Sequence, residues 1–118
     1  MDQNNFLEIL KNKMDGYVHF VYKISKKFPK EETYGSKSQL RRSTLSVILN
    51  FTEGYARKKQ AVKLNFWEIA YGSLKESKYL IYFSFIEEWI SEEDYLYAIK
   101  VSEEIGAMLW KAMQPLQN

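Results

Sequence analysis

Polar residues recur as regularly as apolar ones in the segment that runs from residue 39 to residue 60. Intervals of four, three, four, three and four residues separate six of them: Gln39, Ser43, Ser46, Asn50, Glu53 and Arg57. A helix turns by about 100° per residue, so these side chains would fall within roughly 40° of one line. The pattern predicts a helix with a polar seam, the name we use for these six positions together with the adjoining Gly54.

Apolar residues flank the seam on both sides. On a helical wheel that starts at Gln39, one group covers about 80–160° and another lies near 240–280°. The first group forms the expected core stripe, with Leu40, Thr44, Val47, Ile48, Phe51 and Tyr55. The second group contains Leu45, Leu49 and Ala56. A monomeric bundle needs only one buried stripe per helix, so the second group predicts a further partner.

The same spacing predicts three other helices. The first carries Phe6, Leu10, Met14, Tyr17, Val21, Ile24 and Phe28. We expect Pro29 to stop it, Ser36 or Ser38 to cap the second helix, and Gly54 to end or loosen that helix. The third helix covers about residues 61–88 and presents Trp67, Ala70, Leu74, Ile81 and Phe85 on one side. The fourth follows the capping-box-like segment SEED (91–94) and presents Tyr95, Ala98, Ile105, Leu109 and Ala112.

Four long helices with short links predict an all-α fold, an antiparallel up-down-up-down four-helix bundle that forms one domain over residues 1–118. Apolar residues surround the third helix between residues 79 and 86. A helix that is apolar all round is buried on every side or covered by a neighbouring subunit. Together with the second apolar group beside the seam, this predicts a homo-oligomer.

Composition excludes several classes of protein. The chain has 118 residues, 46% of them hydrophobic, which is typical of a globular domain. It has no cysteine, so disulfides and thiolate metal sites are excluded. The first ten residues show no signal peptide, and the apolar run YLIYFSFI (79–86) is too short to span a bilayer. We therefore expect a cytoplasmic protein without a membrane partner.

Enzymatic chemistry finds little support in the residues. The di-iron sites of helical bundles need Glu-x-x-His pairs, and the single histidine, His19, belongs to none. His19 lies four residues after Asp15, so we expect a local pair or a solvated side chain. Gly54 and Gly72 are isolated and do not form a phosphate-binding loop. The sequence predicts a non-enzymatic protein with no catalytic residues, no metal and no cofactor.

Basic residues gather at two helix junctions, although the net charge is only +2. The first junction holds Lys26, Lys27, Lys30, Lys37, Arg41 and Arg42, and it shares its end of the bundle with several acidic residues. The second holds Arg57, Lys58, Lys59 and Lys63 with few acidic neighbours. We expect phosphate contacts at the second cluster first, with Arg41 and Arg42 secondary. Solvated helix ends are the alternative interpretation of both clusters.

The seam also has two interpretations. Its small residues would let helices approach closely and fix their register, whereas a direct ligand role would use its polar atoms instead. Asn50 and Glu53 would be unfavourable if buried without partners, so we expect them to be shielded and hydrogen-bonded, with Arg57 one turn from Glu53.

These residues resemble a known family, the bacterial four-helix-bundle proteins encoded in intervening sequences of 23S rRNA genes. The first matching block is Gln39-Leu40-Arg41-Arg42-Ser43, Ser46-Val47, Asn50-Phe51, Glu53-Gly54 and Arg57. The second is Phe66, Ile69-Ala70, Gly72-Ser73-Leu74 and Glu76. Ile48 stands where the family often has proline and Phe51 where it usually has isoleucine, and neither disturbs the fold.

The resemblance implies a homopentameric barrel of bundles. It also implies kinship with the accessory variability protein of diversity-generating retroelements, which binds nucleic acid and a reverse transcriptase. Two functions follow as expectations. One is an oligomer that binds nucleic acid, either structured RNA or an RNA–DNA hybrid, through its basic helix-end clusters. The other is a scaffolding oligomer that binds a reverse transcriptase or another protein without nucleic acid. The aromatic residues fit buried stripes, so we expect no base-stacking platform.

Overall fold

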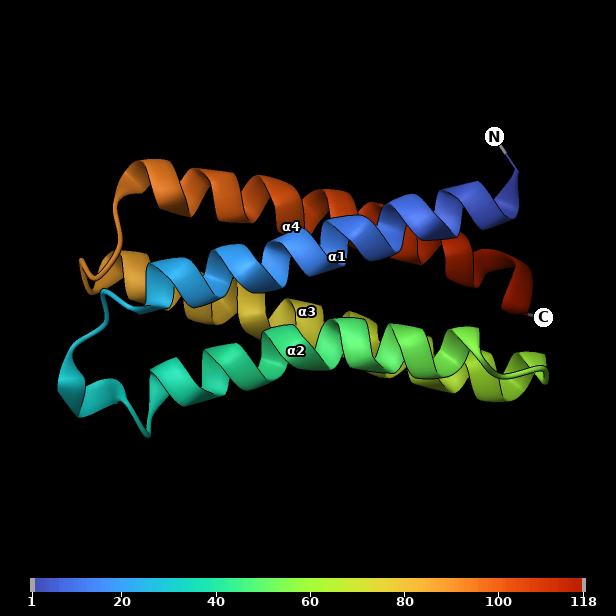
Figure 1. Cartoon of the computed structure of the whole chain (residues 1–118), viewed down its shortest axis with the longest axis horizontal. Coiled ribbons are helices and arrows are strands. Elements are labelled where there is room, and N and C mark those ends of the chain that lie inside the picture. Colours follow the sequence, from blue (N-terminus) through green and yellow to red (C-terminus); the bar gives the residue numbers. More distant parts are fainter. Residues whose placement is uncertain (1, 118) are drawn as a thin grey trace.

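The computed structural model describes residues 2–117, and in this range the chain is helical, with short links (Figure 1). The long helices are α1 (Gln3–Ser25), α2 (Ser36–Tyr55), α3 (Gln60–Ile86) and α4 (Glu92–Met113). Short 3-10 helices occupy Lys30–Glu32 and Gln114–Leu116. Each long helix runs opposite to the one before it in Figure 1, which confirms the predicted all-α, up-down-up-down bundle.

The four apolar stripes meet along the axis of a bundle that measures 43 × 27 × 20 Å. The largest fully buried side chains include Trp67, Tyr17, Phe51 and Met14. Most predicted core positions are buried, but Tyr55 is 44% exposed because it lies in the last turn of α2. Phe85, in the last turn of α3, is only half-buried and stacks on Tyr95 with ring centroids 4.4 Å apart. The spacing therefore predicted the core well in the helix interiors and less well at the ends.

The end of α1 differs from the prediction. The helix ends at Ser25, four residues before Pro29, and the turn that follows buries Phe28 against Trp89 with ring centroids 5.1 Å apart. The side chain of Arg41, from α2, reaches the last turn of α1, where its Nη2 donates to the carbonyl of Tyr22 at 3.0 Å. A side chain from another helix thus satisfies one of the free carbonyls that every helix end leaves.

The cap of α2 is also not the predicted one. Ser36 is the first residue of the helix, and neither Ser36 nor Ser38 caps it. The Glu32 carboxylate performs this role from the preceding link, accepting from the Ser36 backbone N–H at 3.2 Å and from its Oγ at 2.6 Å. These two bonds lower the pKa of Glu32, so its carboxylate is charged at neutral pH. At α4, by contrast, the predicted cap is confirmed, because Ser91 Oγ accepts from the Asp94 N–H at 3.1 Å.

Gly54 neither ends nor loosens α2, which continues to Tyr55, so that expectation was wrong. The residue is buried, and a Cβ placed on it would lie 2.6 Å from Trp67 Cδ1 and Nε1. Trp67 donates from Nε1 to the carbonyl of Phe51 at 3.1 Å and stacks on its ring at 5.2 Å. Gly54 therefore provides the space that lets α3 place an indole against the backbone of α2.

Candidate nucleic-acid interface

The polar seam lies along the groove between α2 and α3, the two helices that pack most closely. Ser46 Oγ and Ser73 Oγ are 2.8 Å apart, and Gln39 Nε2 donates to Glu76 Oε2 at 2.6 Å. Ser43 is buried and donates to the carbonyl of Leu40 in its own helix. Small side chains and polar bonds across the two helices thus hold their register, which agrees with the packing interpretation of the seam.

The two larger polar residues of the seam behave differently from each other. Asn50 is half-buried and donates from Nδ2 to the carbonyl and to the Oγ of Ser46, both at 2.9 Å, so its predicted hydrogen bonding is confirmed. The prediction that Glu53 is shielded was wrong for the single chain, because 48% of its side chain is exposed. Near the end of α2 the Glu53 carboxylate pairs with Arg57 at 2.6 Å in solvent, as their spacing indicated.

The second basic cluster occupies the end of the bundle where residues 56–59 link α2 to α3 (Figure 1). Arg57 is engaged by Glu53 and lies over the ring of Phe66 at 5.2 Å. Lys63 is half-buried, with Nζ 5.6 Å from the centre of the Trp67 ring. Lys58 and Lys59 are exposed, and neither forms an ion pair with any carboxylate of residues 2–117. The cluster therefore offers two cations directly to a phosphate and two that already have partners.

Arg41 and Arg42, the secondary candidates, are neighbours on α2 that differ in their contacts. Arg41 Nε donates to Ser25 Oγ at 2.8 Å and its guanidinium lies 4.4 Å from the centre of the Tyr22 ring. These bonds, with the bond to the Tyr22 carbonyl, make Arg41 a clamp between α1 and α2, a structural role that sequence reasoning missed. Arg42 is exposed, and no ion pair to it occurs in the described range.

Acidic residues reach the first basic cluster, as expected. Lys27 Nζ lies 2.9 Å from Asp94 Oδ2, so a residue of the first junction is paired with one from the start of α4. This pair reduces the field available to a phosphate at that junction.

The groove on the outer side of α2 has a volume of about 620 Å³. Its walls carry three cations from α2, Lys37, Arg41 and Arg42, and its far end is formed by Leu45, Leu49 and Asn50. Tyr34, in the link before α2, stands at its basic end and is 96% exposed. Sequence reasoning missed Tyr34, because a single tyrosine in a polar link has no periodicity that would set it apart.

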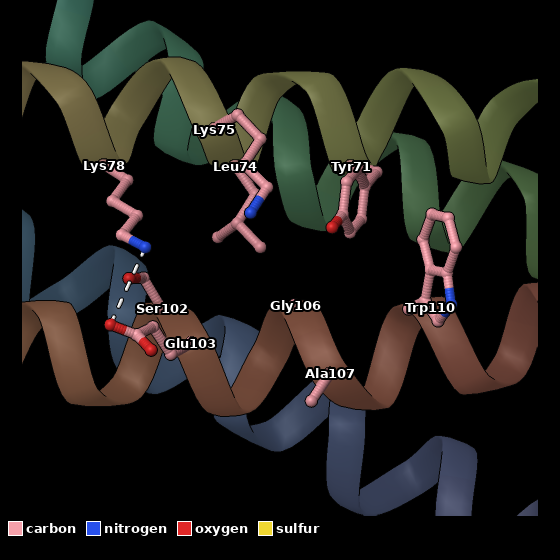
Figure 2. A pocket seen from close by; sticks show the side chains of 9 residues that line it. All are labelled: Tyr71, Leu74, Lys75, Lys78, Ser102, Glu103, Gly106, Ala107 and Trp110. Carbon is pink, nitrogen blue, oxygen red and sulfur yellow. Dashed lines mark ion pairs between the residues drawn. The ribbon is translucent and has the colours of Figure 1, made fainter.

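A second groove, of about 450 Å³, separates α3 from α4 (Figure 2). Figure 2 shows Lys78 reaching toward Glu103, with Nζ and Oε1 3.6 Å apart, and Tyr71 and Trp110 facing the other end. The Tyr71 and Trp110 rings are 5.6 Å apart. Because a carboxylate of the groove already pairs with one of its lysines, this groove is less suited to an anion than the groove of α2.

The remaining chemistry is sparse. Among residues 2–117, no three histidine, cysteine, aspartate or glutamate side chains come together as a possible metal site. His19 lies 3.4 Å from Asp15 Oδ1 on the exposed face of α1, the local pair that their spacing indicated. No helix in the described part of the chain has the length and hydropathy to cross a membrane.

Comparison with known proteins agrees with the fold. The family model described as 23S rRNA-intervening sequence protein matches residues 7–111. A similar solved structure, at 1.70 Å resolution, is that of a protein with unknown function from the S23 ribosomal protein family of Bacteroides thetaiotaomicron VPI-5482. The alignment covers 89% of this chain and 98% of that one, with a TM-score of 0.82 and 22% identity, which supports the fold alone. No curated protein matches the chain.

Proposed function

The chain belongs to the family of 23S rRNA-intervening sequence proteins, and from this premise we propose that it is a non-enzymatic, self-associating protein that binds nucleic acid. The observation that carries the proposal is the pair Lys58 and Lys59, exposed at one end of the bundle without an ion-pair partner in the described range. Phosphate neutralisation strengthens with each cation engaged, so an oligomer that repeats this pair around a rim binds more strongly than one copy.

Self-association is supported by exposed apolar residues beside the seam. Leu49 is 63% exposed and Ile69 is 45% exposed. Leu49 follows Ser46 by three residues, and Ile69 precedes Ser73 by four. Because α2 and α3 are antiparallel, both steps run the same way from the Ser46–Ser73 bond, so the two side chains lie at the same level of the bundle. Covering them removes apolar surface from water. We propose five copies, the number that the family resemblance implies.

The test is a filter-binding titration with mixed RNA and DNA at about 50 and 200 mM salt. A double charge reversal, Lys58→Glu with Lys59→Glu, removes two phosphate contacts and should reduce the slope of log affinity against log salt by about 1.4–1.8. The matched control is Lys23→Glu with Lys100→Glu, which changes the net charge equally at exposed positions on α1 and α4. The proposed contact is wrong if both double variants reduce the slope to the same extent.

A scaffolding function is the second candidate, and a specific surface favours it. Exposed apolar and aromatic side chains on α3 and α4 include Tyr79, Tyr82, Ile86 and Leu96. Large exposed apolar patches are typical of protein–protein contacts. A stable oligomer that retains neither RNA nor DNA at low salt would favour this second function.

A further inference from the structure

The basic end of the α2 groove combines charge and an exposed aromatic ring. Its lining residues include Lys37, Arg41 and Arg42 and no carboxylate. Tyr34 beside them is 96% exposed, more than any other large hydrophobic side chain in the described range. An aromatic ring left almost entirely in water contributes nothing to the core, so its place beside three cations points to a ligand.

Local hydrogen bonds hold the segment that carries Tyr34. After Tyr34 the backbone is tied back to Glu32, whose carbonyl accepts from the Gly35 N–H at 3.1 Å and whose carboxylate accepts from Ser36. Before Tyr34, the Thr33 N–H donates to the carbonyl of Lys30 at 3.1 Å. The ring is thus presented from a short segment with fixed ends, which reduces the conformational entropy lost when a ligand stacks on it.

The cations of the groove are arranged for an anion. Arg41 is held in place by Tyr22 and Ser25, so its charge forms a fixed part of the wall. Lys37 and Arg42 form no ion pair with any carboxylate of residues 2–117. The Glu32 carboxylate, two residues before Tyr34, is bonded to Ser36, and no carboxylate of the described residues lines the groove, so positive charge exceeds negative charge along its walls.

We propose that this end of the groove binds single-stranded nucleic acid, with one base stacked on Tyr34 and the flanking phosphates on Lys37 and Arg42. In a duplex the bases are paired and stacked on one another, so only an unpaired base can stack on a side chain. The proposal rests on the proposed function, to which it adds a second contact and a preference for single strands. It departs from the expectation that the chain offers no base-stacking platform.

Fluorescence anisotropy with a labelled oligo(dT) of about 12 nucleotides, and with a duplex of the same length, tests the proposal. Tyr34→Ala removes the stacking of one base and should weaken binding of the single strand about 5- to 150-fold. Duplex binding should not change. Tyr34→Phe keeps the ring and should bind as the unchanged protein does. Tyr97→Ala is the matched control, since Tyr97 is also exposed, at 53%, but lies on α4.

The phosphate contacts have their own test. Lys37→Gln combined with Arg42→Gln should reduce the salt slope for the single strand by about 1.4. In a photocrosslinking experiment, an oligonucleotide that carries 5-iododeoxyuridine should become attached to the peptide that contains Tyr34. Circular dichroism of each variant checks that the helices remain formed.

The outcomes separate this inference from the proposed function. If the protein binds nucleic acid but Tyr34→Ala leaves the ratio of single-strand to duplex affinity unchanged, the inference is wrong and the role of Lys58 and Lys59 stands. If neither probe binds at low salt, both proposals are wrong. If Tyr34→Ala weakens oligo(dT) binding while reversal of Lys58 and Lys59 has no effect, nucleic-acid binding and the inference stand and the contact through Lys58 and Lys59 is wrong. Displacement of oligo(dT) by poly-glutamate at equal charge concentration would overturn it in favour of an acidic polypeptide.

Discussion

At the scale of single residues, Gly54 sets the distance between the two helices that carry the seam. Trp67 cannot move aside easily, because its Nε1 donates to the Phe51 carbonyl at 3.1 Å and its ring stacks on that of Phe51. The family motif contains this glycine next to Glu53, and only the structure gives a physical reason for it. The requirement is for space, since no glycine in the described range has a positive φ.

Substitution of Gly54 by alanine should therefore destabilise the fold. The new Cβ would lie 2.6 Å from two atoms of Trp67, and overpacking of this kind costs about 1–3 kcal/mol. Gly72→Ala is the matched control, because no neighbouring atom lies within 4 Å of its Cβ position and alanine favours a helix interior by about 0.5–1 kcal/mol. Urea unfolding followed by circular dichroism measures both. Equal stability of the two variants would contradict the close-approach role of Gly54.

At the scale of helices, the spacing of apolar residues predicted where helices form better than where they end. The interior positions follow one rule, the helical repeat, and the sequence displays it directly. Helix ends depend on which of several polar groups reaches the free backbone atoms. Glu32 outcompetes Ser36 at the start of α2, and Arg41 reaches the end of α1 from 16 residues beyond Ser25. Such contacts depend on the folded path of the chain, which spacing does not give.

The burial of Tyr17, where α1 packs against α3, makes the stability of the fold depend on pH in the alkaline range. Tyr17 is buried, its hydroxyl lies 2.8 Å from Ser77 Oγ, and Ser77 in turn donates to the Leu74 carbonyl. Burial raises the pKa of Tyr17 well above its usual value of 10.0, and the hydrogen bond with Ser77 opposes this by less. Above pH 10 the unfolded chain loses this proton while the folded chain keeps it, so the stability present in full below pH 10 falls as the pH rises.

Tyr17→Phe should remove this dependence. The unchanged protein should lose up to about 1.4 kcal/mol per pH unit more than the variant once the pH exceeds that of the free phenol. Ser77 keeps its bond to Leu74, so the variant should lose only about 1 kcal/mol at neutral pH. Unfolding free energies at about pH 8 and pH 11 measure the difference. Tyr97→Phe, at an exposed position, is the control, and parallel curves for all three proteins would contradict the argument.

At the scale of the whole molecule, the sequence predicted the bundle and part of the candidate site. Lys58 and Lys59 could be predicted because three basic residues follow a helix end directly in the chain. The groove of α2 could not, because it joins Tyr22 of α1, Tyr34 of the link and Arg42 of α2, which only the fold brings together. The sequence also could not show that Arg41 bonds to Ser25 and Tyr22 of α1, because the fold brings these residues together.

Assembly gives the last prediction. Leu49 is 63% exposed beside the seam, and Leu96 is 57% exposed on the outer side of α4, so the two leucines differ in position far more than in exposure. If copies associate through the seam side of α2 and α3, Leu49→Asp places a charge in the interface, where it is unpaired and strongly unfavourable. Leu96→Asp should leave the assembly intact.

Light scattering should give a mass near five times the 14.1 kDa of one chain for the unchanged protein and for Leu96→Asp, and a smaller mass for Leu49→Asp. A monomeric mass for the unchanged protein at micromolar concentration would leave the second apolar group beside the seam without an explanation, whereas equal dissociation of both variants would place the interface elsewhere.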